Sequence, residues 1–151
     1  MKHFINLQDI PAKDLRKILI EAKKRKTLRK RLNNLDVDPG SPLKGNLLIQ
    51  MFEKSSLRTR LSFYLAIKQL GGSTLTLRPD ELHLAKGGES IADTAKILSN
   101  FGNAFMLRTD NEIKLNEFKK YLSIPIINGL SPSSHPTQIL SDIFTVEEIK
   151  K

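Results

Sequence analysis

The amino-acid sequence predicts a single α/β domain with a doubly wound, mostly parallel four-stranded sheet flanked by helices. Four short runs of apolar or β-branched residues alternate with helical patterns along the chain, and this order is typical of parallel sheets. The length of 151 residues, with 39% hydrophobic and 27% charged residues, is sufficient for one globular core. We therefore expect residues 1–151 to form one domain.

The first predicted element is a basic amphipathic helix within residues 13–31. Its apolar residues follow the i, i+3, i+4, i+7 spacing of a helix face: Leu15, Ile18, Leu19 and Ala22. The other face carries much of the net charge of +9, which results from 25 Lys and Arg against 16 Asp and Glu. We interpret it as a solvated face, because aromatic residues make up only 6% of the sequence and no nucleic-acid-binding motif is present. A polyanion-binding surface is the alternative.

A turn-rich segment separates this helix from the next strand. Residues 33–42 contain many turn formers and indicate a surface loop. The apolar run at about 46–52 predicts a strand, and the pattern at about 56–70 predicts a helix that ends at the glycine pair 71–72. We expect this helix to place four side chains in the core: Leu57, Leu61, Tyr64 and Leu65.

The middle of the chain repeats the order of strand and helix. A β-branched run at 73–77 predicts a short strand, and the weak pattern of 79–89 predicts a loop. A helix is expected at about 90–101, where Ser90 followed three residues later by Asp93 resembles a capping box.

The last third predicts two more strands, each followed by a helix. The expected elements are a strand at 104–107, a helix at 112–122, a strand at 124–128 and a helix at about 136–149. Pro125 argues against a central position for the fourth strand, because proline has no N–H to donate. Asn128 and Gly129 indicate the start of a turn, and Pro136 suits the first turn of the last helix.

The clearest functional signal is the segment 52–60, which lies between the first strand and the following helix. The first N–H groups of a helix lack intrahelical partners and carry partial positive charge. Ser56 and Thr59 add hydroxyl donors, and Arg58 adds a fork that fits phosphate oxygens. The segment therefore predicts a phosphate site, although no Walker-type glycine-rich motif is present. An N-cap serine followed by surface arginines is the alternative.

Two further polar clusters follow predicted strands and are expected at the same sheet edge. Arg108 follows the third strand and the segment 135–138 follows the fourth, and ligands of parallel sheets bind at the carboxyl ends of strands. Each has an ordinary alternative: Arg108 pairs with Asp110 or Glu112 in solvent, and His135 simply precedes a helix. Together with a phosphate site, the clusters suit acyl transfer from an acyl phosphate to an external amine, because cations stabilise the leaving phosphate and the developing oxyanion.

Other classes of protein are disfavoured by composition. The sequence has no cysteine, which excludes disulfides and thiolate zinc sites and fits a reducing compartment. No apolar run approaches the length of a membrane span, and the N-terminus lacks the apolar core of a secretory signal. We expect a cytoplasmic protein with no metal, no nucleic acid and no membrane among its partners.

Four motifs, taken together, resemble the aspartate/ornithine carbamoyltransferase family and are most similar to the carbamoyl-phosphate-binding half of the ornithine enzymes. The match extends over nearly the whole chain, in order and at family-like spacing. The motifs are Phe-Glu-Lys-Ser-Ser-Leu-Arg-Thr-Arg at 52–60, Glu-Ser-Ile-Ala-Asp-Thr-Ala at 89–95, Met-Leu-Arg-Thr at 106–109 and His-Pro-Thr-Gln at 135–138.

The resemblance implies transfer of the carbamoyl group of carbamoyl phosphate to the δ-amino group of L-ornithine, without a cofactor. It implies that Ser56, Leu57 (through its N–H), Arg58 and Thr59 bind the phosphate. It also implies that Arg108, His135 and Thr59 act at the carbamoyl oxygen. Gln138 would read the carbamoyl amide, and Pro136 and Thr137 belong to the same motif. Such enzymes form trimers in which a neighbouring subunit's loop completes each site, and that loop corresponds here to His83 and Lys86.

Three departures from the family pattern bear on this expectation. Leu57 replaces a threonine, so one hydroxyl is absent. The loop at 83–89 is one residue longer than the family's Gln-Leu-Gly-Arg-Gly-Glu, with His83 in place of the glutamine and Lys86 in place of the arginine. The amino-acid-binding domain of the family has no counterpart in this chain, so we expect an isolated domain that does not turn over substrate alone. An aspartate carbamoyltransferase half is the alternative within the family.

Overall fold

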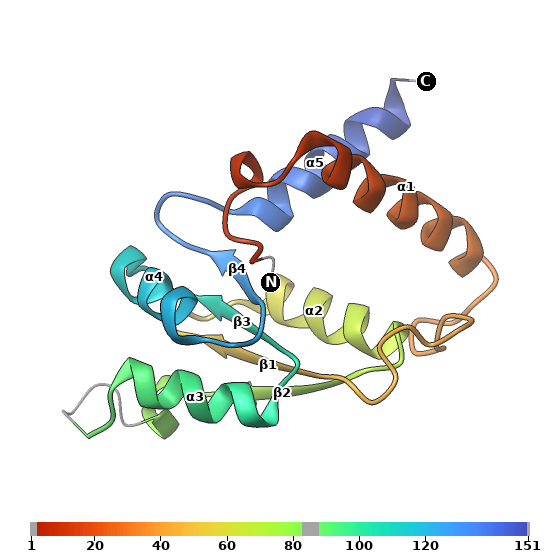
Figure 1. Cartoon of the computed structure of the whole chain (residues 1–151). Helices are drawn as coiled ribbons and strands as arrows, with labels where there is room; N and C mark the ends of the chain where they lie inside the picture. Colours follow the sequence, from red (N-terminus) through yellow and green to blue (C-terminus); the bar gives the residue numbers. More distant parts are fainter. Residues whose placement is uncertain (1–2, 83–87, 151) are drawn as a thin grey trace.

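A parallel sheet forms the centre of the molecule (Figure 1). The computed structural model describes residues 3–82 and 88–150. Within them the sheet has the order β2-β1-β3-β4, and each pairing is parallel. The strands are β1 (Leu47–Phe52), β2 (Ser73–Leu77), β3 (Ala104–Arg108) and β4 (Ile126–Leu130). The predicted fold class is confirmed.

Helices cover both faces of the sheet, with α3 and α4 on one face and α1, α2 and α5 on the other (Figure 1). This arrangement is the expected doubly wound architecture. The helices are α1 (Ala12–Arg29), α2 (Leu57–Gln69), α3 (Ile91–Phe101), α4 (Glu112–Tyr121) and α5 (Pro136–Ile149), with short 3-10 turns η1 (Leu7–Asp9) and η2 (Pro79–Leu82).

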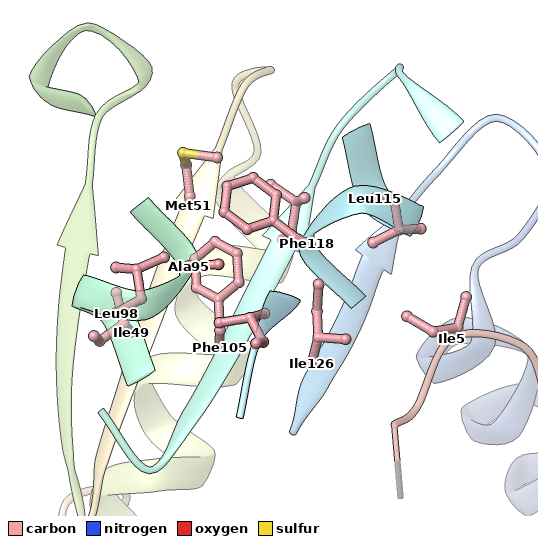
Figure 2. Close-up of a cluster of buried hydrophobic side chains, with 11 residues drawn as sticks. Ile5, Ile49, Met51, Ala95, Leu98, Phe105, Leu115, Phe118 and Ile126 are labelled. Carbon is pink, nitrogen blue, oxygen red and sulfur yellow. The ribbon is translucent and has the colours of Figure 1, made fainter. Parts of the chain in front are cut away.

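The larger hydrophobic core lies between the sheet and helices α3 and α4 (Figure 2). Side chains alternate between the faces of a strand, so Ile49 and Met51 enter this core while Leu48 and Phe52 face α2. Phe105 of β3 packs against Phe118 of α4 with ring centroids 5.1 Å apart. The same alternation places Met106 and Arg108 of β3 on the α2 face, which matters for the site described below.

The core face predicted for α2 is wrong at three of its four positions, and the fourth residue, Leu65, is half-buried. Leu57, Leu61 and Tyr64 are 74%, 49% and 44% exposed. The helix instead turns Phe63 and Ile67 toward the sheet. The apolar spacing of α2 fits more than one helix face, and contact with Leu48, Phe52 and Met106 of the sheet selects the face that carries Phe63 and Ile67.

β4 begins and ends two residues later than predicted, so Asn128 and Gly129 lie within the strand and do not form a turn. The N-terminal segment explains the shift, because it adds a further parallel bridge along β4. The Phe4 N–H donates to Ile126 O at 2.9 Å, and the Asn128 N–H donates to Phe4 O at 2.8 Å. Pro125 precedes the strand, where its missing N–H has no consequence.

The helix signal at Ser90 is confirmed. The Ser90 hydroxyl oxygen accepts from the Asp93 N–H at 3.1 Å, and the Ser90 hydroxyl donates to the Asp93 carboxylate at 2.7 Å. Asn111 caps α4 in the same way, because its side chain accepts from the Lys114 N–H at 3.0 Å.

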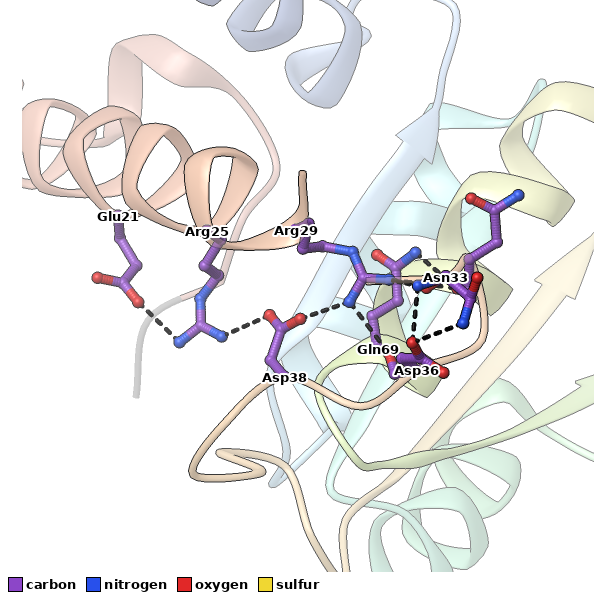
Figure 3. A network of polar contacts seen from close by, with 8 residues as sticks. Glu21, Arg25, Arg29, Asn33, Asp36, Asp38 and Gln69 are labelled. Atoms are coloured by element: carbon purple, nitrogen blue, oxygen red, sulfur yellow. Dashed lines mark hydrogen bonds and ion pairs between the residues drawn. The ribbon is translucent and has the colours of Figure 1, made fainter. Parts of the chain in front are cut away.

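Asp38 ties the basic helix to the rest of the domain (Figure 3). Its side chain is 4% exposed and pairs with Arg25 of α1 at 2.9 Å and with Arg29 of α1. The Asp38 N–H donates to Gln69 O at the end of α2 at 2.7 Å. Two arginines of the basic helix thus form ion pairs within the domain. The segment 33–42 is a surface loop in which Asp38 is a buried anchor.

Helix α1 also exchanges charges with α5. Arg16 pairs with Glu147 at 2.5 Å, and Lys26 pairs with Glu148 at 2.6 Å. Part of the positive charge of α1 is therefore offset by neighbouring carboxylates. Along the described stretches 3–82 and 88–150, no helix combines the length and the apolar character needed to cross a membrane.

Candidate active site

The three polar segments singled out in the sequence meet at one edge of the sheet. Phe52 at the end of β1 is opposite Arg108 at the end of β3, and Arg108 is opposite Leu130 at the end of β4. The chain leaves β1 and β4 directly toward α2 and α5. Parallel pairing in this register therefore brings the first turns of both helices next to Arg108.

These segments surround a cleft of about 510 Å³. Most of its lining residues carry hydrogen-bond donors, and two arginines supply positive charge. The lining residues are Ser55, Ser56, Leu57, Arg58, Thr59, Arg108, Leu130, His135 and Gln138. A side cavity of about 290 Å³ continues between α2 and α5 and shares Arg58, Thr59, His135 and Gln138 with the cleft.

The first turn of α2 forms one wall of the cleft and offers free donors. Ser56 occupies the N-cap position with extended backbone angles, but its side chain makes no capping hydrogen bond. The ordinary interpretation of Ser56 as a capping side chain is therefore wrong. The Arg58 side chain is exposed and has no ion pair among the described residues, and Leu57 projects into solvent. Positive charge and unpartnered N–H groups make this helix start suitable for an anion.

Arg108 reaches across the sheet edge to Thr59. Its Nη1 donates to Thr59 Oγ1 at 3.1 Å, and Thr59 is 9% exposed. Its Nε is buried and has no hydrogen-bond partner in the described part of the chain. The expected alternative, pairing with neighbouring carboxylates, is wrong: Asp110 pairs with Lys54 at 3.0 Å, and Glu112 accepts from Ser133 at 3.0 Å.

His135 is held in an environment that favours its neutral form. It is half-buried at the N-cap of α5, and its Nδ1 lies 3.3 Å from Thr137 Oγ1. Burial lowers the pKa of His135, and the positive charge of Arg108 lowers it further, against a smaller opposing effect of Asp142. A neutral imidazole next to a fixed guanidinium suits hydrogen bonding to a polarised carbonyl group.

The other residues of the His-Pro-Thr-Gln motif lie in different places: one lines the cleft, one lines the side cavity and one lines neither. Gln138 lines the cleft, and its Nε2 donates to Asp142 Oδ1 at 2.9 Å, which leaves its carbonyl oxygen as an acceptor. Thr137 lines the side cavity. Pro136 is buried at the first position of α5 and lines neither space. His83 and Lys86, expected from a neighbouring subunit, lie outside the described residues.

Sequence reasoning missed a polar cluster beside the cleft. Glu53 follows β1 and accepts hydrogen bonds from Thr109 Oγ1 and Lys114 Nζ, and the Glu53 N–H donates to Arg108 O at 3.0 Å. The cluster joins the ends of β1 and β3. Glu53 and Thr109 stand inside the motifs at 52–60 and 106–109, but their spacing alone does not reveal that they meet. Within residues 3–82 and 88–150, no group of three or more histidine and carboxylate side chains could hold a metal ion.

Comparison with known proteins agrees with the geometry. A family model described as aspartate/ornithine carbamoyltransferase, carbamoyl-P binding domain, matches residues 2–148. The ornithine carbamoyltransferase of Brucella ovis is 44% identical over 148 residues, which cover 98% of this chain and 46% of that protein. The ornithine carbamoyltransferase of Rhizorhabdus wittichii is 42% identical over 149 residues, covering 99% and 48%. The chain thus spans about half the length of these relatives.

Solved structures give the same result. The ornithine carbamoyltransferase of Pyrococcus furiosus superimposes with a TM-score of 0.90 at 40% identity, covering 99% of this chain and 46% of that one. The catalytic subunit of M. jannaschii aspartate transcarbamoylase superimposes with a TM-score of 0.84 at 35% identity, covering 100% and 48%. The chain therefore belongs to the aspartate/ornithine carbamoyltransferase family, as a carbamoyl-phosphate-binding domain most similar to that of ornithine carbamoyltransferases.

Proposed function

We propose that this chain is the carbamoyl-phosphate-binding half of an ornithine carbamoyltransferase that acts in arginine biosynthesis. The observation that carries the proposal is the cleft where the first turn of α2, Arg108 and the start of α5 meet. Cationic side chains and free helix N–H groups suit the phosphate. A neutral imidazole beside a guanidinium suits a carbonyl that gains negative charge during reaction.

The phosphate group of the ligand lies at the start of α2 in this proposal. Ser56 and Thr59 donate from their hydroxyls, Leu57 donates through its backbone N–H, and Arg58 forms charge-assisted hydrogen bonds. The leucine at position 57 removes one side-chain donor relative to threonine but keeps the backbone donor. This assignment is supported by two observations on the described residues: the Ser56 side chain makes no capping hydrogen bond, and the Arg58 guanidinium has no ion pair.

The carbamoyl group lies deeper in the cleft, next to Arg108 and His135. An amine attacks the carbonyl carbon, the C–O bond to phosphate breaks with its electrons leaving on the phosphate, and the departing phosphate takes up the proton that the amine nitrogen loses. Arg108, held by its hydrogen bond to Thr59, and His135 donate to the carbonyl oxygen as charge accumulates there. The carbonyl oxygen of Gln138 accepts from the carbamoyl NH₂, because its own amide nitrogen is bonded to Asp142. Pro136 and Thr137 hold this segment in place.

We further propose that turnover needs more than this chain. L-Ornithine would be held by the part of the relatives that this chain does not span, so the 151-residue chain binds carbamoyl phosphate but does not form citrulline at an enzyme-like rate. In the complete protein we expect a trimer in the cytoplasm, with His83 and Lys86 of one subunit contributing to the site of a neighbour.

The acceptor amine distinguishes two members of the family. The likeness to an aspartate transcarbamoylase catalytic subunit makes aspartate the competing acceptor. A complete protein that contains this chain is expected to carbamoylate ornithine and not aspartate. Preference for aspartate would replace the proposed function by the pyrimidine-pathway enzyme.

Nucleic-acid binding is disfavoured because several cations of α1 already have carboxylate partners: Arg16, Arg25, Lys26 and Arg29. A nucleic-acid-binding module would show affinity that falls steeply with salt and is insensitive to Arg58→Ala.

Calorimetry with carbamoyl phosphate, or with a stable phosphonate analogue, tests the proposal. Hydrogen bonds to charged groups contribute about 1.5–3 kcal/mol, so Arg58→Ala is expected to weaken binding roughly 10- to 100-fold. Arg78→Ala serves as the matched control, because Arg78 is another exposed arginine that does not line the cleft. Equal affinity of wild type and Arg58→Ala would overturn the phosphate site.

A further inference from the structure

The side chain of Asn128 is a fully buried amide within β4, two residues before the strand ends. It is 0% exposed, and each of its polar atoms has a partner. Its Oδ1 accepts from the Leu130 N–H at 3.0 Å. Its Nδ2 donates to Ile5 O at 3.2 Å, Ser131 Oγ at 3.0 Å and Ser134 O at 3.3 Å.

These contacts organise the segment between β4 and α5 around one side chain. The Ser131 N–H donates to Ser134 O at 2.9 Å, which closes a tight turn, and Asn128 Nδ2 contacts both ends of that turn. Leu130 O accepts from the Thr109 N–H at 3.0 Å, so the start of the turn is also fixed to the end of β3. The turn is therefore held from two sides.

The turn leads directly into the cleft. Leu130 lines the cleft, and Ser134 immediately precedes His135, the N-cap residue of α5. Because Asn128 bonds to the backbone of both Leu130 and Ser134, it determines where the chain enters α5 and hence where the imidazole lies relative to Arg108.

The chemistry of the contacts requires an amide. One end must accept from a backbone N–H while the other donates to carbonyl and hydroxyl oxygens, and an asparagine side chain does both. Leucine has a similar size but offers neither function, and it would leave buried backbone groups without partners.

We propose that Asn128 is a positioning residue that holds His135 in register with Arg108 by fixing the turn at 130–134. This inference rests on the proposed function of the cleft. A purely structural residue would change only the free energy of unfolding. A positioning residue changes the surroundings of His135 and the affinity for carbamoyl phosphate in protein that remains folded.

The test compares Asn128→Leu with a destabilised control, Leu98→Ala, in the full 151-residue chain. Leu98 is 4% exposed in the core between the sheet and α3, and it does not line the cleft. NMR titration of the His135 ring, assigned with His135→Asn, reports its surroundings, and calorimetry reports carbamoyl phosphate affinity. Ser131→Ala is a milder variant that removes one acceptor of the Asn128 amide, together with the long 3.5 Å contact from Ser131 Oγ to Ser134 O.

In Asn128→Leu we expect the pKa of His135 to rise toward its ordinary value, because burial and Arg108, which lower it, act less on a displaced ring, while Asp142 remains on the same helix. We expect affinity to fall about tenfold or more. Leu98→Ala is expected to leave the pKa of His135 unchanged and the affinity for carbamoyl phosphate within about twofold of wild type. Ser131→Ala is expected to shift the pKa and the affinity in the same direction as Asn128→Leu.

A folded Asn128→Leu protein with wild-type titration and affinity overturns the inference. If Asn128→Leu does not fold, Ser131→Ala decides: a wild-type His135 signal in that variant overturns the inference, and a shifted one supports it. If the wild-type chain itself does not bind carbamoyl phosphate, the proposed function fails, and the His135 titration alone decides the positioning role of Asn128.

Discussion

Arg108 Nη1 donates to Thr59 Oγ1 at 3.1 Å, and this contact joins the end of β3 to the first turn of α2. Thr59 is buried and Arg108 is half-buried, so water replaces the lost partner poorly if either side chain is removed. The contact fixes the guanidinium next to the helix N-terminus that is proposed to bind phosphate.

The substitution Thr59→Val is expected to release Arg108. Valine keeps the shape of threonine but removes the acceptor, so a charged donor loses its partner at a cost of about 1–3 kcal/mol in the free energy of unfolding. We also expect binding of carbamoyl phosphate to weaken by about tenfold or more, because the phosphate loses the proposed Thr59 hydroxyl donor and the guanidinium is no longer held in place. Denaturant unfolding and calorimetry measure the two effects.

The matched control for this prediction is Thr94→Val. Thr94 is 1% exposed on α3, and its hydroxyl has no hydrogen-bond partner among the described residues. The same atomic change there is expected to leave affinity unaltered and not to lower stability. Equal effects of the two variants on affinity would show that Thr59 has no special relation to Arg108.

Replacing Asp38 by alanine is expected to loosen α1 from the domain. The change leaves Arg25 and Arg29 facing a site without its carboxylate, and removal of one partner of a buried ion pair costs about 3–5 kcal/mol. The arginine side chains are 28% and 17% exposed, so we expect the lower end, about 3 kcal/mol. Urea unfolding measures it.

Glu147→Ala provides the comparison for Asp38→Ala, because it breaks an ion pair with Arg16 whose side chains are 41% and 60% exposed. Such surface pairs contribute at most about 1 kcal/mol. If Asp38→Ala lost no more unfolding free energy than Glu147→Ala, the role of Asp38 as a buried anchor would be contradicted.

The substitution Gly129→Ala is expected to destabilise β4 by about 1–3 kcal/mol through overpacking. A Cβ at position 129 would lie 2.4 Å from Met106 Sδ, and Met106 is fully buried. Adding Met106→Val removes the obstructing sulfur. The double variant is therefore expected to lose less unfolding free energy than the sum of the losses of the two single variants. Additive losses in denaturant unfolding would refute the predicted steric clash.

The stability of the protein is expected to depend on pH through His135. Because the pKa of His135 is lower in the folded state than its ordinary value of 6.5, folding favours the neutral ring. The contribution to stability is complete above pH 6.5 and is lost as the pH falls through the lower folded-state pKa. His3, whose pKa is also lowered by burial, acts in the same direction.

Unfolding free energies measured between pH 7.5 and about 5 check this prediction. The wild type is expected to lose stability as the pH falls, and His135→Gln is expected to lose less over the same window. His3→Gln gives the share of the second histidine. An identical pH dependence of wild type and His135→Gln would show that His135 is not held in its neutral form.

Local patterns predicted the elements well because short apolar runs, caps and glycine stops act over a few residues. The strand at 73–77 and the cap at Ser90 could be predicted from neighbouring residues alone. The inward face of α2 was mispredicted because several of its faces are apolar, and the sheet selects the one with Phe63 and Ile67. β4 was mispredicted because its position depends on the N-terminal segment, far away in sequence.

The sequence by itself determined that hydroxyl and guanidinium donors at 56–59 follow a strand, and that Arg108 and the motif at 135–138 follow two further strands. Only the tertiary structure decided that Arg108 bonds to Thr59 and not to a neighbouring carboxylate, and that Asn128 is buried beneath the turn before His135. The physical reason is that strand register and side-chain alternation fix which face each residue occupies. These constraints arise from hydrogen bonds between segments that are distant along the chain.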